Sequence, residues 1–171
     1  MSMKKQAFSV LADNHPGVLL RLTGLFSRRG FNIDSLIACN TENPAVSRIT
    51  VVVSGDDEGV FSQVIRQMFK LEEVIKVEML DLDDCTASEM VLVKVATDDA
   101  VKRTALLKAA QSYGGRVLDI GEKTVTLELT GETTEMDAFI GAIEPFGICE
   151  MARSGVTVLQ RGDTTIHDYT I

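Results

Sequence analysis

The sequence predicts an α+β fold built from two ferredoxin-like βαββαβ domains. Segments with the two-residue apolar period of a strand alternate with segments that have the helical period of about 3.6 residues. The order strand, helix, strand, strand, helix, strand occurs twice along the 171 residues. This order gives an antiparallel sheet with both helices on one face.

The first repeat opens with a strand, a turn, a helix and a second strand within residues 8–36. The turn Asp13–Gly17 breaks the first strand, and there Asn14 can cap the helix while Pro16 presets a first-turn φ. Gly30 ends the helix as a left-handed C-terminal residue does. The apolar residues of the strand and the helix recur at the expected spacings: Phe8, Val10 and Ala12, then Val18, Leu22, Leu25 and Phe26.

The first repeat continues with a strand at 47–53, a helix at 61–68 and a closing strand at 75–79. Between the first two of these, Gly55–Asp57 is predicted to be a turn that supplies the helix cap. Residues 81–88 are polar and lack an apolar period. We expect them to form a linker that repulsion among its aspartates keeps extended.

The second repeat has the same element order with different residues. It comprises a strand at 91–95, a helix capped by Asp98 or Asp99, a hairpin over 116–130, a helix that starts at Thr133 or Thr134, and a strand over 148–159. Pro145 prevents the second helix from continuing. The last strand is expected to be interrupted near residues 154–155. Residues 161–171 are polar without a clear period, which predicts a flexible tail.

The turn between the first strand and the first helix has residues suited to a small ligand. Free N–H groups at the helix start, beside Asn14 and Gly17, suit a carboxylate. Gly17 allows close approach to the backbone, and Asn32 offers both a donor and an acceptor. Together these groups could hold a free amino acid. A plain βαβ unit whose caps serve only folding is the alternative that spacing by itself favours.

Composition excludes several classes. The net charge of −8 does not suit nucleic-acid binding, which requires a concentrated basic face. No apolar run approaches the length of a membrane span, and residues 1–5 precede no signal-peptide core. Three widely spaced cysteines argue against a disulfide framework or a zinc site. These features predict a cytoplasmic protein that binds neither membrane nor nucleic acid.

Catalytic and metal-binding motifs are not recognisable. The two histidines, His15 and His167, have no nucleophile partner in a known pattern. Asp56–Asp57 and Asp98–Asp99 each precede a predicted helix, so capping explains them better than metal binding. The stretch 115–124, GRVLDIGEKT, lacks the glycine spacing of a phosphate loop and reads as a hairpin turn. We therefore predict no catalytic residue, metal or cofactor in this chain.

Several motifs resemble one known family. DNHPGVLLRLTGLFSRRGFNIDSL at 13–36 and SRIT at 47–50 resemble the ACT domain of the regulatory small subunit of acetolactate synthase, also called acetohydroxyacid synthase. The resemblance continues through residues 90–95, 130–131, 137–140, 152–155 and 161–162, and so covers nearly the whole chain. One departure is Cys39–Asn40, where the family commonly has glycine and proline. We expect this departure to concern the approach of a loop and not the ligand turn.

The resemblance implies an organisation and a function. It implies an ACT domain at 6–82 for effector binding and dimerisation, a C-terminal small-subunit domain at 88–160, and a flexible tail at 161–171. It also implies a regulatory subunit that binds a branched-chain amino acid such as valine, and that activates the catalytic large subunit and confers feedback inhibition on it. Thiamine diphosphate, magnesium and FAD would belong to that partner. The alternative is a free-standing amino-acid-sensing ACT regulator.

The resemblance further implies a site shared between two ACT domains of a homodimer. One subunit would supply Asn14, Gly17 and Val18, because DNHPGV matches the family motif. The other would supply Asn32 and Ile33, because GFNI matches it. Arg153 and the break at 154–155 are candidates for contact with the catalytic subunit, with a folding role as the alternative.

Overall fold

The computed structural model describes residues 4–28, 30–55 and 58–167. They form two compact units. The first combines the described residues up to Thr86 with those from Val156 onward, and the second comprises Ala87–Gly155. Both units are antiparallel α+β sheets with the βαββαβ order, which confirms the predicted fold class.

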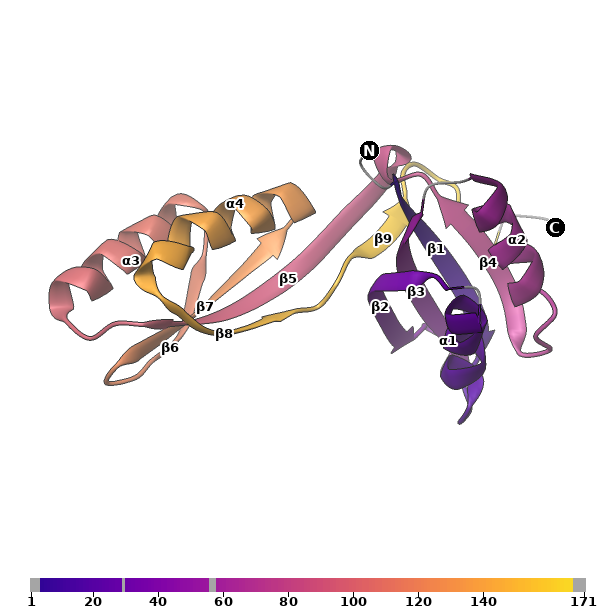
Figure 1. Ribbon diagram of the computed structural model, residues 1–171, viewed down its shortest axis with the longest axis horizontal. Coiled ribbons are helices and arrows are strands. Elements are labelled where there is room, and N and C mark those ends of the chain that lie inside the picture. Colours follow the sequence, from indigo (N-terminus) through magenta and orange to yellow (C-terminus); the bar gives the residue numbers. More distant parts are fainter. Residues whose placement is uncertain (1–3, 29, 56–57, 168–171) are drawn as a thin grey trace. The chain divides into compact units, whose positions relative to one another are not determined.

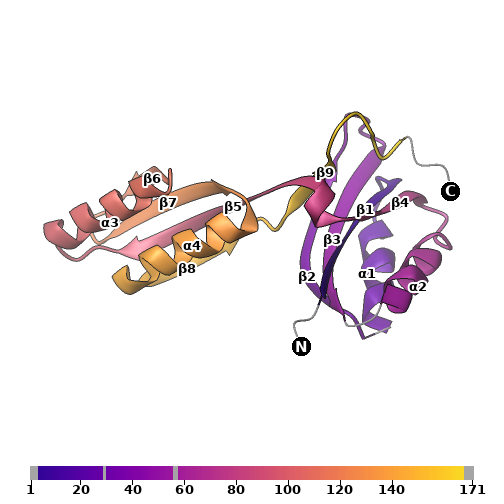
Figure 2. The same ribbon diagram turned by 90° about the horizontal axis from the view of Figure 1, so that it is seen from above.

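The first unit holds a four-stranded sheet in the order β2-β3-β1-β4, and its strand pairs are antiparallel. Helices α1 and α2 lie together on one face of this sheet (Figures 1 and 2). The helix cap predicted at Asp56–Asp57 lies outside the described residues. The elements are β1 Lys4–Asp13, α1 Val18–Arg28, β2 Asn32–Asn40, β3 Val46–Gly55, α2 Glu58–Met68 and β4 Val74–Leu80.

The core of the first unit lies between this sheet and its two helices. The Phe8 ring packs against Phe26 and Phe61, with centroids 6.4 and 6.1 Å away. The apolar residues that alternate along β1 and recur at helical spacing along α1 are buried in this core, as predicted. On β4, however, Ile75 and Met79 are 44% and 49% exposed, because this strand lies at the sheet edge. The buried cluster comprises Phe8, Val10, Ala12, Val18, Leu22, Phe26, Ile49, Val51, Val53, Phe61, Val64 and Met68.

The second unit repeats the arrangement with strand order β6-β7-β5-β8, and α3 and α4 lie on one face (Figure 1). Strands β5 and β7 alternate buried and less buried positions, as half-buried strands do. The elements are β5 Cys85–Ala96, α3 Ala100–Ser112, β6 Arg116–Ile120, β7 Thr124–Gly131, α4 Thr133–Ile143 and β8 Ile148–Arg153. Its core contains Val91, Val93, Val95, Leu106, Ala110, Val125, Leu127, Leu129, Met136, Phe139 and Ile143.

Local signals explain the helix ends of the second unit. The Asp99 side chain accepts a hydrogen bond from the Lys102 N–H at 2.7 Å, which caps α3 as predicted. The Glu135 carboxylate accepts from the Glu132 N–H at 2.9 Å at the start of α4. After α4 a 3₁₀ turn, Glu144–Phe146, contains Pro145. The proline ends the α-helix because its ring cannot fit within the helical ladder.

The segment between the two repeats differs from its prediction. The expected extended linker is a 3₁₀ turn, Leu82–Asp84, followed directly by β5. The Asp81 side chain stabilises this turn by accepting from the Asp83 N–H at 3.1 Å, so capping outweighs repulsion among the aspartates.

The C-terminal segment also differs. Strand β9, Thr157–Gln160, belongs to the first unit and pairs with β5, although the predicted second domain reached residue 160. Ile166, within the predicted flexible tail, is only 6% exposed. Apolar side chains spaced too far apart to show a period can still be buried by tertiary packing.

Candidate functional site

The turn after β1 is the first part of the candidate site. Gly17 has a φ of +95°, which an L side chain rarely adopts, so glycine is required here. Its carbonyl accepts from the Arg21 N–H at 3.1 Å and thereby begins α1. The helix starts at Val18, so the prediction that Asn14 caps it is wrong. The two residues Pro16 and Gly17 extend the turn and carry Asn14 away from the cap position.

Asn14 instead joins the turn to the loop between β2 and β3. Its backbone N–H donates to the Ala45 carbonyl at 2.8 Å. Its side-chain Nδ2 donates to the Pro44 carbonyl at 2.9 Å and to Asn40 Oδ1 at 3.2 Å. Asn40 belongs to the departure from the family pattern at residues 39–40. The expectation that this departure avoids the ligand turn is therefore wrong.

A hollow lies between this turn and the sheet. Among its lining residues, Val18 is almost fully buried, at 4% exposure, while Asn14 and His15 are exposed. Both polar and apolar residues line the hollow, which suits a ligand with both kinds of group. The lining residues are Asp13, Asn14, His15, Val18, Leu19, Ala38, Cys39, Asn40, Ser47 and Ile49.

Asn32 and Ile33 line a different hollow, beside the end of α1. Gly30, with a φ of +72°, turns the chain there from the helix into β2. Asn32 Nδ2 donates to Asp34 Oδ1 at 3.3 Å, and the Ser54 hydroxyl donates to Asp34 Oδ2. The other lining residues are Leu20, Thr23, Gly24, Ser27 and Phe31.

A single chain does not bring the two predicted sets together. Helix α1, with 11 residues, separates them. At about 1.5 Å per residue, the helix is roughly 16 Å long. Asn14, Gly17 and Val18 therefore lie at one end of α1, while Asn32 and Ile33 lie beyond the other. Strand β2, which carries Asn32, is at the edge of the sheet, and Leu20 on α1 is 76% exposed.

Sequence reasoning missed two residues that shape the turn. The Arg21 guanidinium pairs with the Glu73 carboxylate, whose residue is 7% exposed and whose backbone carbonyl accepts from the Asp13 N–H at 2.9 Å. Glu73 therefore holds both sides of the turn. No local pattern around Glu73 predicts this role, because its partners Arg21 and Asp13 lie 52 and 60 positions away in the sequence.

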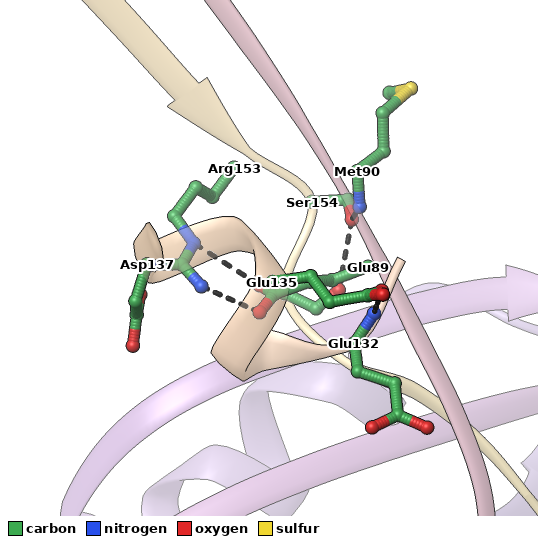
Figure 3. Close-up of polar contacts among 8 residues, drawn as sticks. Glu89, Met90, Glu132, Glu135, Asp137, Arg153 and Ser154 are labelled. Carbon is green, nitrogen blue, oxygen red and sulfur yellow. Dashed lines mark hydrogen bonds and ion pairs between the residues drawn. The ribbon is translucent and has the colours of Figure 1, made fainter. Parts of the chain in front are cut away.

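Arg153 lies among acidic side chains of the second unit (Figure 3). Its Nε donates to Glu89 Oε2 at 3.1 Å and its Nη1 to Asp137 Oδ1 at 2.9 Å. The hydrogen bond with Glu89 is the main cause that raises the pKa of Arg153. The Ser154 hydroxyl accepts from the Met90 N–H at 2.9 Å. These contacts join β8, β5 and α4, so they serve folding.

Reactive groups do not cluster in the described part of the chain. His15 Nδ1 lies 3.1 Å from the Pro16 carbonyl, and His167 Nε2 lies 3.7 Å from Glu42 Oε1. Burial is the main cause that raises the pKa of the Cys85 thiol, followed by the negative charge of Glu78. Among the described residues, no group of three or more His, Cys, Asp or Glu could hold a metal ion. No helix among them is long and apolar enough to cross a membrane.

Comparison with known families defines the class of the first unit. The family model described as AHAS small subunit-like ACT domain matches residues 8–76, which include β1, α1 and the strands around the turn. The chain is therefore an ACT-domain protein. A second model, described as the small subunit of acetolactate synthase, matches residues 88–162.

Relatives extend the match to nearly the whole chain. The probable acetolactate synthase small subunit of Methanothermobacter thermautotrophicus is 37% identical, over 92% of this chain and 94% of the relative. The small subunit of Mycobacterium bovis is 41% identical over 95% of each. The crystal structure of the small subunit from Thermotoga maritima has a TM-score of 0.84 and 31% identity, over 95% of this chain and 100% of that one. The chain belongs to the family of acetolactate synthase small subunits, which confirms the resemblance and supports a regulatory role.

Proposed function

We propose that this chain is the non-catalytic regulatory subunit of an acetolactate synthase. It binds a branched-chain amino acid, with valine the first candidate, between paired ACT domains. The bound amino acid inhibits a catalytic large subunit that the chain otherwise activates. Family membership supports this role, and branched-chain amino-acid biosynthesis is the pathway we propose for it. Thiamine diphosphate, magnesium and FAD would be held by the catalytic partner.

The separation of the site residues by α1 is the observation that carries the proposal. Two copies that pair through their β2 edges around a two-fold axis bring antiparallel strands together and remove an exposed edge. Their α1 helices then also run antiparallel. The start of one helix lies beside the end of the other, so Asn14, Gly17 and Val18 of one copy meet Asn32 and Ile33 of its partner.

The chemistry of this shared cleft suits an aliphatic amino acid. N–H groups at the start of α1 bind the carboxylate, aided by the helix dipole. Asn14 Oδ1 accepts from the ammonium group, and Asn32, which has two amide hydrogens, donates one to the carboxylate. Val18 and Ile33 form the wall around the side chain. One methylene changes binding by only about 1–3 kcal/mol, so valine, leucine and isoleucine compete for the site.

The substitution Asn32→Asp tests the site. An ionised aspartate cannot donate to the carboxylate and repels it. Losing one charge-assisted hydrogen bond costs roughly 1.5–3 kcal/mol, so the valine concentration for half inhibition should rise at least about tenfold. Activation without valine should persist, because the two side chains have nearly the same shape. The measurement is acetolactate formation by the reconstituted enzyme across a valine titration.

A matched control and two contrary outcomes sharpen this test. Gln111→Glu makes the same amide-to-carboxylate change on an exposed face of α3 and should leave the midpoint unchanged. An unchanged midpoint in Asn32→Asp removes Asn32 from the site. Failure of the unmodified chain to respond to valine, leucine or isoleucine removes the effector. A pull-down that recovers no large thiamine-diphosphate enzyme favours a free-standing sensor.

A further inference from the structure

The face of the first sheet that points away from α1 and α2 is unexpectedly buried. Cross-strand rows on β3, β1 and β4 follow from the strand register. All six members of the first two rows are at most 6% exposed, although both helices lie on the other face. The three rows are Val52, Ala7 and Leu80; Thr50, Ser9 and Glu78; and Arg48, Leu11 and Lys76.

The chain's own C-terminal segment crosses this face. We name residues 157–167 the strap. At one end of the third row, Arg48 Nη2 donates to the Val158 carbonyl at 3.1 Å. At the other end, Lys76 Nζ donates to the His167 carbonyl. Leu11 lies between these anchors in the register and is 3% exposed.

The strap is packed as well as hydrogen-bonded. Val158 is 1% exposed and Ile166 is 6% exposed. The Arg161 N–H also donates to the Asp84 carbonyl at 3.1 Å. Figure 2 shows β9 on the side of the sheet opposite the two helices. The strap is therefore a third layer of the first unit, behind its sheet.

One end of the strap reaches the loop that holds the ligand turn. His167 Nε2 lies 3.7 Å from Glu42 Oε1, and the pair is ionic when His167 is protonated. Glu42 belongs to the loop 41–45, whose Pro44 and Ala45 carbonyls accept from Asn14. Two contacts thus lead from the strap to Asn14.

We infer that the strap is a positioning segment for the amino-acid site. By fixing β3, β4 and the loop 41–45 from behind, it holds Asn14 in the conformation that receives the ligand. The strap follows the second unit directly in the chain. This inference rests on the proposed function for its effect on valine, but its effect on the turn is independent of any ligand.

The substitution Ile166→Asp tests the strap, with Leu159→Asp as its matched control. Both replace an apolar strap residue with an acid, but Leu159 is 56% exposed and Ile166 is buried. Hydrogen exchange of the full-length chain without ligand should be about tenfold faster at the Asn14, Thr41 and Val46 amides in Ile166→Asp. Leu159→Asp should exchange as the unmodified chain does. These three amides donate within the turn and the loop.

The valine titration then provides a second measurement. The midpoint should rise several-fold in Ile166→Asp and stay constant in Leu159→Asp. If the unmodified chain does not respond to valine, the proposed function fails. The exchange data still test whether the strap positions the turn. If exchange at these amides is equal in both variants, the strap inference is overturned.

A milder variant separates loss of the strap from loss of the fold. If Ile166→Asp accelerates exchange throughout the first unit, Ile166→Ala should still accelerate it selectively, by several-fold, at the turn and the loop. Uniform acceleration in Ile166→Ala, including the Phe8 and Val51 amides of the core strands, would overturn the inference. Such a result would mean that the strap contributes only general stability.

Discussion

The two units have the same element order but differ in the second face of their sheets. In the first unit, that face is buried, with Ala7, Ser9 and Val52 at most 5% exposed, and the strap is anchored to it through Arg48 and Lys76. In the second unit, the corresponding face carries ion pairs. Lys94 Nζ lies 3.7 Å from Glu150 Oε2, and Arg116 Nη2 lies 2.9 Å from Glu128 Oε1.

The strand sequences already reflect this difference. Strand β7 alternates Val125, Leu127 and Leu129 with threonines and glutamate, the pattern of a sheet with one wet face. Residues 49–53 of β3, ITVVV, are nearly continuous apolar sequence, the pattern of a strand covered on both faces. One topology can therefore support a unit with two layers and a unit with three.

The largest expected effect comes from placing a charge on equivalent positions of the two faces. Val52 on β3 and Thr126 on β7 each pair with the central strand of their sheet, opposite Ala7 and Lys94. Val52→Asp should lower the free energy of unfolding by roughly 3–5 kcal/mol, since it buries an uncompensated charge. Thr126→Asp should change the free energy of unfolding by less than about 1 kcal/mol. The new carboxylate would lie between Lys94, which attracts it, and Asp119, which repels it, so the two effects offset each other.

Urea unfolding of both full-length variants checks this difference. The tryptophan-free chain can be followed by far-ultraviolet circular dichroism. Equal destabilisation by the two substitutions would mean that the second faces do not differ in burial, and the contrast between the units would be lost.

An intermediate effect is expected from the arginine–glutamate pair of each unit. Arg153 binds Glu89 through two nitrogens with its side chain 30% exposed, whereas Arg21 binds Glu73 through one and is 62% exposed. Glu89→Gln should cost roughly 1.5–3 kcal/mol, the range for hydrogen bonds to charged groups. Glu73→Gln should cost at most about 1 kcal/mol, because solvent screens the exposed arginine.

Thermal unfolding in high and low salt distinguishes the two pairs. Salt should weaken the contribution of Glu73 more than that of Glu89, since exposed pairs are screened more. The reverse ranking of the two substitutions would show that the pair near the turn is the stronger one.

The smallest expected effect concerns the helix starts. Helix α3 follows Asp98 and its cap Asp99, whereas α1 follows Gly17, which has no side chain to accept a hydrogen bond. The hydrogen bond from Lys102 is the main cause that lowers the pKa of Asp98. The stability that Asp98 adds is therefore present above its unfolded pKa and is lost as the pH falls through its lower folded pKa.

Asp98→Asn should accordingly melt slightly below the unmodified chain at neutral pH. The two melting temperatures should converge in acid, below the folded pKa of Asp98. The check is a pair of melting curves from pH 7 down to pH 2. A difference that persists at pH 2 would rule out the charge of Asp98 as its cause.

The element order and the cap of α3 could be predicted from the sequence, whereas the prediction that Asn14 caps α1 is wrong. Periodicity over a few neighbouring residues gave both sheets, and Asp99 caps α3 as its position predicts. Gly17 and Gly30, placed at turns by the sequence, have positive φ values. These features depend on backbone geometry and on partners within a few positions, which a sequence pattern contains.

The contacts that hold the candidate site could be found only in the folded structure. Asn14 binds Pro44, 30 positions away, and the strap binds through Arg48 and Lys76 across 110 and 91 positions. The predicted flexible tail therefore includes a buried Ile166, and the predicted site residues lie at opposite ends of one helix. No local period encodes such contacts, because they depend on which distant surfaces the folded sheet brings together and on how much apolar area their packing removes from water.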